Sequence, residues 1–301
     1  MLNLDKIEKR YLEYWNKENH DRPILDIRAP KKQAGAVVPE FKGTIEERWL
    51  DTEYMVKSGR ASVENTYFGA DAYPLIWPNL GPDIFGAFFG LDLNFAEGTS
   101  WVKQHYEDLR EVDCSVLDCN NKWLKKVMEM TEALVADSKG DYLVGLTDIH
   151  SGMDALVSLR GPEETCFDIY ECPELVKEKT LQLCDRFKEF YDLSNAVIQK
   201  CQKGNGNWLS GYHPEGWYTT SCDFMGMISN EMYKEFIEPV LLKELTFLKN
   251  SIFHLDGIGA LRHLDDLLAI PELDGIQWVA GAGRPTAAHW VPVLKKLQDA
   301  G

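Results

Sequence analysis

The stretch SIFHLDGIGALRHLDDLLAIPELDGIQWVAGAG, residues 251–283, decides the fold. An apolar run at Ile252-Phe253 ends in His254 and Asp256, a glycine and a helical pattern follow, and a second apolar run begins at Gly275. Short apolar runs that alternate with helical patterns are typical of parallel strands covered by helices. We therefore predict a strand, a helix and a second strand here, with polar side chains where the first strand ends.

The same alternation extends along the chain. Leu4, Ile7 and Tyr11 recur at helical spacing and predict a first helix over residues 3–19. A longer helix is predicted from Pro173 to about Gln202. The predicted strands are residues 23–27, 71–77, 142–147, 207–211, 251–255 and 275–279. No repeat or linker-like segment divides the chain, so we predict one α/β domain, residues 1–301.

Two architectures fit parallel strands covered by helices, a doubly wound sheet and a barrel. No glycine-rich phosphate loop of either common type follows an early strand. Polar clusters instead follow several successive strands, which favours a TIM (β/α)8-type barrel. A closed barrel needs eight strands, and six are predicted. Either strands within residues 44–137 escape the pattern, or the chain lacks its last β/α units.

Composition narrows the classes of partner. The 301 residues are 45% hydrophobic, which is enough for a substantial core. The formal net charge of −16 argues against unassisted binding to nucleic acid or an anionic membrane, and leaves small-molecule substrates and proteins. No apolar run approaches the roughly 20 residues of a membrane helix, and no signal-peptide pattern opens the chain. Seven cysteines without a C-x-x-C pair indicate reduced thiols, and we predict a cytoplasmic protein.

Polar and aromatic residues gather at or near the C-terminal ends of four predicted strands. Because barrel active sites lie at the C-terminal ends of the strands, we expect these residues to share one cavity. They are Asp148 and His150; Tyr212, His213 and Trp217, with Cys222 and Asp223 shortly after; His254 and Asp256; and Gln277 and Trp278.

The pair His254 and Asp256 can supply two metal ligands from one strand end, and Cys222 is the candidate third ligand. Other interpretations stay open. Asp256 could cap the following helix while His254 bonds a core carbonyl, and Asp148 and His150 could form a buried ion pair. The same carboxylates could also move protons with no metal present.

Several motifs resemble the superfamily of uroporphyrinogen decarboxylase and the corrinoid-linked and cobalamin-independent methyltransferases. The matching segments are residues 23–29 with 32–41, similar to the family's R-Q-A-G-R…P-E-Y; Leu159-Arg160-Gly161 with Pro173-Glu174; residues 223–239, DFMGMISNEMYKEFIEP; and residues 253–257, where methyltransferase members carry H-x-C-G. The resemblance implies the barrel fold, and its members continue for about two further β/α units.

Departures from the family pattern bear on the activity. Lys32 and Ala36 stand where the decarboxylase has two arginines, and Pro78 stands at the place of its aspartate, so true uroporphyrinogen decarboxylation is disfavoured. Methyltransferase relatives hold zinc through H-x-C and a later cysteine, and the metal activates a thiol. Here Asp256 replaces the first of those cysteines, which predicts a more electropositive metal and an acceptor other than a thiol.

The resemblance and the clusters together predict a methyltransferase that moves a methyl group between a small substrate and a corrinoid held by a partner protein. The predicted roles are catalytic for Asp148, His150 and Asp223; substrate-binding for Tyr212, His213, Trp217, Gln277 and Trp278; and zinc-binding for His254, Asp256 and Cys222.

Two alternative functions belong to other classes of protein. One is a decarboxylase or lyase acting on a carboxylated substrate, which needs cations such as Arg160, Arg262 or Arg284. The other is a corrinoid-binding protein without enzymatic activity.

Overall fold

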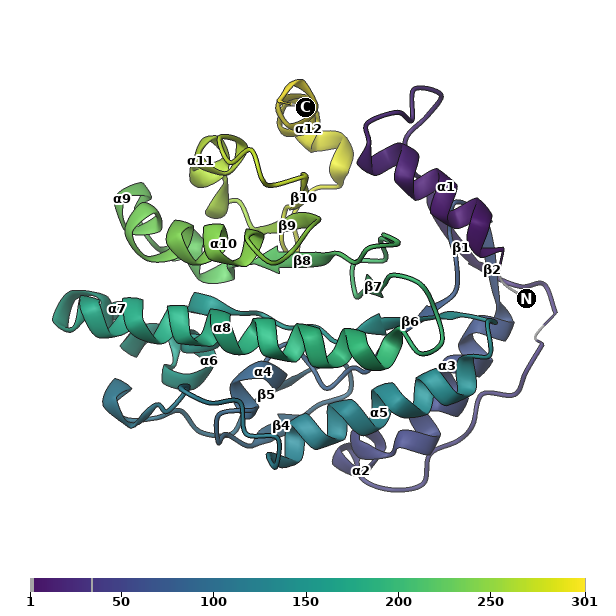
Figure 1. Ribbon diagram of the computed structural model, residues 1–301, viewed down its shortest axis with the longest axis horizontal. Helices are drawn as coiled ribbons and strands as arrows, with labels where there is room; N and C mark the ends of the chain where they lie inside the picture. The colour runs from purple at the N-terminus through teal and green to yellow at the C-terminus, as the bar shows by residue number, and fades with distance from the viewer. Residues whose placement is uncertain (1–2, 34, 301) are drawn as a thin grey trace. The chain divides into compact units, whose positions relative to one another are not determined.

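The structure is a computed structural model that describes residues 3–33 and 35–300 (Figure 1). Met1, Leu2 and Gly301, at the ends of the predicted domain, and Ala34, inside the 32–41 motif, lie outside the described residues. The chain divides into two compact units. Unit 1 comprises Met1–Lys103, Asp118–Ile149 and Glu189–Trp217, and unit 2 comprises Gln104–Leu117, His150–Lys188 and Tyr218–Gly301.

Unit 1 contains helices and three small sheets. Its helices are α1 (Leu4–Trp15), α2 (Ile45–Leu50), α3 (Thr52–Asn65), α4 (Ile84–Ala87), α5 (Lys122–Ser138) and the last part of α8 (Pro173–Ile198). Its strands are β1 (Asp26–Pro30), β2 (Thr66–Ala70), β3 (Leu75–Ile76), β4 (Leu93–Phe95), β5 (Ser100–Val102), β6 (Leu143–Leu146) and β7 (Gly206–Asn207).

The parallel sheet of unit 1 has the order β3-β6-β7. Its central strand β6 is buried at all four positions, as the apolar run predicts. The predicted strand at 23–27 is displaced: β1 begins at Asp26, is exposed throughout and pairs antiparallel with β2. The reason is that Asp26 and Arg28 alternate with apolar residues, a pattern of a solvated ribbon rather than of a buried parallel strand.

Helix α1 packs on the core of unit 1 through Tyr11, which lies in a buried cluster with Tyr73, Leu143 and Tyr212. Asn3 caps the helix by accepting a hydrogen bond from the Lys6 backbone N–H. The helix is shorter than the predicted residues 3–19, because Lys17 adopts a left-handed conformation just past its end.

Unit 2 contains a parallel sheet of order β8-β9-β10 and its helices. The strands are β8 (Tyr218–Ser221), β9 (Ser251–Asp256) and β10 (Gly275–Val279). The α-helices are α6 (Gly152–Arg160), α7 (Pro162–Glu171), the first part of α8, α9 (Asn230–Met232), α10 (Glu238–Leu245), α11 (Leu264–Leu268) and α12 (Val291–Asp299). The short 3-10 helices are η1 (Leu109–Glu111), η2 (Asp223–Met227), η4 (Ala260–His263) and η5 (Ala287–Trp290), and η3 (Tyr233–Ile237) is a π-helix.

The α/β class with parallel strands and helices is confirmed. The strands predicted at 251–255 and 275–279 are β9 and β10, and the long helix predicted from Pro173 is α8. Strand β8 was not predicted because its sequence, Tyr-Thr-Thr-Ser, lacks an apolar run. Between residues 44 and 137, β2, β4 and β5 were likewise not predicted. Pairing among the described residues joins three parallel strands in each unit and does not close a barrel.

Among the described helices, none combines the length and the apolar character needed to cross a lipid bilayer.

One turn of unit 1 has a strict requirement for glycine. Gly204 has φ +65°, and a Cβ atom there would lie 2.1 Å from the His213 carbonyl oxygen and 2.6 Å from the Pro214 Cα atom. We expect Gly204→Ala to lower the free energy of unfolding by roughly 3 kcal/mol or more, because both neighbours are backbone atoms.

The matched control is Gly140→Ala, where φ is +80° but no other described atom lies within 4 Å of the added Cβ. That variant carries only the left-handed strain, about 1 to 2 kcal/mol. Urea denaturation measures both, and equal losses in the two variants would show that the clash at Gly204 is relieved.

Candidate functional site

The register of the parallel sheet in unit 2 lines up three polar side chains. Ser221 on β8 and Gln277 on β10 both pair with His254 on β9. Register partners on neighbouring parallel strands point to the same face of a sheet, and so do residues two apart on one strand. Ser221, His254 and Gln277 therefore form one row, with Asp256 on the same face, two residues further along β9.

Gln277 determines which nitrogen of His254 carries the proton. The Nδ1 atom of His254 lies 2.5 Å from the Gln277 Oε1 atom. An amide oxygen only accepts hydrogen bonds, so Nδ1 is the donor and a neutral His254 has its lone pair on Nε2. This is the arrangement that commonly orients a metal-binding histidine.

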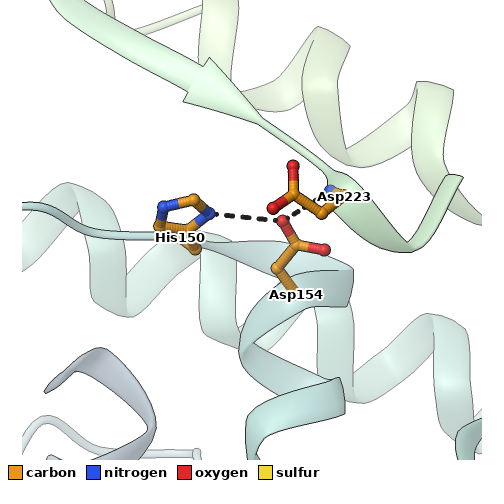
Figure 2. Close-up of side chains that lie close together, drawn as sticks. All are labelled: His150, Asp154 and Asp223. Carbon is orange, nitrogen blue, oxygen red and sulfur yellow. Dashed lines mark hydrogen bonds and ion pairs between the residues drawn. The ribbon is translucent and has the colours of Figure 1, made fainter. Parts of the chain in front are cut away.

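Asp154, in the first turn of α6, ties that helix to the chain after β8. Its carboxylate accepts a hydrogen bond of 2.8 Å from the backbone N–H of Asp223 (Figure 2). It accepts another, of 3.1 Å, from the backbone N–H of Phe224. Burial pushes the pKa of Asp154 upward, but His150 and these two backbone donors outweigh it and hold the pKa below its usual value. A buried carboxylate is therefore kept ionised.

His150 lies beside this carboxylate. Its Nδ1 atom is 3.4 Å from Asp154 Oδ2 and 3.0 Å from the Ser221 hydroxyl oxygen (Figure 2 shows the contact with Asp154). The ring, the Asp154 carboxylate and the Asp223 carboxylate each offer a ligand atom, and these three atoms lie within 4.8 Å of one another.

Asp223 also belongs to a second group, with His254 and Asp256, whose ligand atoms again lie within 4.8 Å of one another. Burial among neighbouring protein atoms, and then the charge of Asp154, raise the pKa of Asp223 to about 6. The side chain nevertheless keeps access to solvent, so solvent screening moderates this effect.

The donor set of this second group fits a divalent metal ion. Within the described residues, Asp256 Oδ1 is buried and has no hydrogen-bond partner, which a buried carboxylate oxygen seldom tolerates without a bound ion or water. The alternative that Asp256 caps the next helix is wrong, because Gly259 occupies the cap position of η4. One imidazole and two carboxylates match zinc or manganese ligation.

Cys222, the predicted third ligand, is not part of either described group. Its thiol is buried, and burial first and then the charge of Asp154 raise its pKa well above the usual value. Cys222 and Asp223 are consecutive, so the structure places the carboxylate rather than the thiol beside His254 and Asp256. Zinc binding by Cys222 stays a prediction that this geometry does not favour.

Four predicted site residues belong to unit 1. Tyr212 and Trp217 are fully buried there, and Trp217 packs on Trp15 with ring centroids 5.5 Å apart. His213 is also buried and accepts a hydrogen bond from the Glu215 backbone N–H. A substrate-binding role for these three, and a catalytic role for Asp148, stay predictions.

In unit 2, Trp278 follows Gln277 on β10, so it points to the opposite face of the sheet. Its ring packs against Trp290 of η5, with centroids 5.4 Å apart. Gln277 therefore faces the candidate site, whereas Trp278 supports the packing of the C-terminal helix; its predicted substrate contact stays untested.

A separate cleft of about 670 Å³ lies in unit 1 between α1, α3 and β2. Its lining includes Arg10, Arg60 and Asp71 but none of the site residues predicted from the sequence. The hydrogen bonds from Arg22 lower the pKa of Asp71 against the opposing effect of burial. The charged side chains that line this cleft are largely paired within the protein, so we place the candidate functional site at the two groups around Asp223 instead.

Asp154, Ser221 and Glu244 were not predicted. His150 and Asp154 are four residues apart, a spacing that brings side chains together at the start of a helix, and this signal could have identified Asp154. Ser221 ends a strand that was itself missed. Glu244, on α10, is an ordinary charged residue of a helical pattern in the sequence, and only tertiary packing buries it.

The parallel strands and helices, with polar side chains gathered where the strands end, define an α/β protein. No protein-family model matches the chain, and no curated protein is significantly similar in sequence. Among solved structures, its fold is similar to that of a methyltransferase from Methanosarcina mazei, with a TM-score of 0.58 and 13% identity. The match covers 90% of this chain and 75% of that one. It supports the predicted resemblance at the level of the fold.

Glu244, in unit 2, makes the free energy of unfolding depend on pH. Burial raises its pKa to about 8, and the charge of Asp154 adds to the effect. The folded state keeps this proton up to about pH 8, whereas an unfolded glutamate loses it near 4.5, so stability falls as pH rises through this range. We expect Glu244→Gln to remove this loss and to raise stability at pH 8 by a few kcal/mol relative to wild type.

Urea denaturation at pH 5 and pH 8 measures the effect. The exposed Glu272→Gln is the control, and should leave the wild-type pH dependence in place. A Glu244→Gln variant that loses as much stability as wild type between the two pH values would contradict the assignment.

Proposed function

We propose that the chain is a methyltransferase of the uroporphyrinogen decarboxylase and methyltransferase superfamily, built as a TIM-type barrel. It moves a methyl group between a small substrate and a corrinoid carried by a partner protein. The motif resemblance and the shared fold with a protein described as a methyltransferase support this assignment.

One observation carries the proposal: Asp223, His254 and Asp256 converge where neighbouring parallel strands end, with a buried Asp256 oxygen that lacks a protein partner. These three residues would hold a zinc ion. When bound, the ion would supply Lewis-acid activation of a substrate oxygen or nitrogen. Because no thiolate ligates it, the ion would retain more positive charge than in the thiol-activating relatives.

Neighbouring residues hold the proposed zinc ligands in place. Gln277 holds His254 in the tautomer with the Nε2 lone pair, and β9 presents His254 and Asp256 on one face. Asp154 holds the Asp223 backbone through its N–H, and therefore positions that carboxylate. His150, beside Asp223, is placed to exchange a proton with a substrate group at the same position.

The alternative activity as a decarboxylase or lyase needs cationic side chains at the site. In unit 2, Arg160 is buried, pairs with Asp168 and donates to the carbonyls of Tyr106 and Glu107. Arg262 donates to the Gly259 carbonyl. Two of the three candidate arginines therefore have protein partners, which weighs against this alternative.

The test uses the purified chain, loaded with zinc, and free cobalamin in place of the corrinoid protein. Cob(I)alamin is offered with methyl ethers, methanol and methylated amines, and methylcobalamin with alcohols, amines and thiols. Formation or loss of the cobalt–methyl bond is followed by visible absorbance. We expect His254→Ala to lower the rate at least 100-fold, and Gln277→Ala to weaken zinc binding roughly 10- to 100-fold.

His289→Ala, on exposed η5, is the matched control and should keep wild-type activity. Full turnover by metal-free protein, or by His254→Ala, would contradict the metal assignment. Cobalamin binding without methyl transfer would favour a non-enzymatic corrinoid carrier. Conversion of uroporphyrinogen to coproporphyrinogen would restore the decarboxylase.

A further inference from the structure

The two groups of ligand atoms in unit 2 share one residue, Asp223. We propose that His150, Asp154 and Asp223 hold a second divalent metal ion, next to the ion at His254 and Asp256, with the Asp223 carboxylate bridging the two. This second site does not rest on methyl transfer, since it follows from the positions of the ligand atoms alone.

The distance between His150 and Asp154 suits metal ligation better than direct hydrogen bonding. Their Nδ1 and Oδ2 atoms are 3.4 Å apart. A charge-assisted hydrogen bond between such groups is usually about 2.7 to 2.9 Å long. Two ligand atoms each about 2.0 to 2.1 Å from a tetrahedral zinc ion lie roughly 3.4 Å apart, so the observed spacing is that of neighbouring ligands.

Asp154 retains the capacity to bind an ion. A carboxylate has about four lone-pair positions, and Asp154 directs them to two backbone N–H groups, the Cys222 thiol and His150. An ion would take the position that now faces His150, where the contact is 3.4 Å long. The carboxylate is nine-tenths buried and rigidly held, as ligating carboxylates usually are. The Ser221 hydroxyl oxygen, 3.0 Å from His150 Nδ1, is close enough to contribute a fourth ligand atom.

The balance of charge points the same way. Asp154, Asp223 and Asp256 gather around two histidines, His150 and His254, in the two groups that share Asp223. Carboxylates crowded in this manner repel one another, and a bound cation relieves the repulsion. Two ions bridged by one carboxylate, about 3.5 to 4 Å apart, are a common arrangement in metalloenzymes.

The competing interpretation is that His150 and Asp154 bind no second ion and only transfer protons, which is the role of His150 in the proposed function. The two differ in the number of ions bound, which is measurable without any assay of activity. A single ion at His254 and Asp256 would leave His150 and Asp154 as such a pair and would overturn the second site.

The experiment titrates metal-stripped protein with manganese(II) chloride and counts bound ions by equilibrium dialysis and elemental analysis. Electron paramagnetic resonance then shows whether the ions are coupled. We expect wild type to bind two ions with an exchange-coupled spectrum. His150→Ala and His254→Ala should each bind one ion and give an uncoupled six-line spectrum. The exposed His20→Ala is the control and should match wild type.

Asp154→Asn tests the other ligand and should also bind one ion. Because Asp154 caps η2, circular dichroism first establishes that this variant is folded, and His150→Ala, which leaves both backbone contacts of Asp154 in place, decides the question if it is not. One ion in wild type, or two in His150→Ala, would overturn the proposal. Two coupled ions without methyl transfer would contradict the proposed function and leave this inference standing.

Discussion

The parallel register of β8, β9 and β10 is the constraint on which the candidate site depends. It aligns Ser221, His254 and Gln277 across three strands and places Asp256 on the same face. A shift of one residue in either pairing would turn the side chains of a strand to the opposite face. His254 would then lose the Gln277 oxygen that selects its tautomer, and Asp256 would leave the group shared with Asp223. The backbone hydrogen bonds between the strands therefore determine which side chains meet at the candidate site.

Part of this arrangement could be predicted from the sequence, for physical reasons. His254 and Asp256 are two residues apart at the end of an apolar run, and strand periodicity alone puts them on one face. Asp223 was predicted to be catalytic, and Cys222 was predicted to be the third ligand. Neighbouring residues point in opposite directions, and the polar sequence of β8 gives no periodicity from which to choose between them. Glu244 could not be found at all, because its burial depends on how α10 packs.

The fold was predictable to a similar extent. Buried parallel strands such as β6 are nearly continuous apolar runs and were recognised, whereas the antiparallel pairs β1-β2 and β4-β5 have mixed sequences and were displaced or missed. The replacement of a cysteine by Asp256 indicated an oxygen ligand beside His254, while Cys222 was still predicted as a sulfur ligand; the geometry brings the Asp223 carboxylate to the group instead.

Asp154 performs two tasks with one side chain. Its oxygens close the first turn of η2 and at the same time face His150. A substitution of Asp154 that removes its contact with His150 also removes the hydrogen bonds that hold the loop carrying Asp223. Selection for the function of the candidate site and selection for folding therefore act on the same side chain. The amino acid at such a position can change during evolution only if its neighbours change with it. In a set of diverged homologues, Asp154, His150 and Asp223 should therefore change in concert or remain unchanged, even where the surrounding helix α6 varies freely.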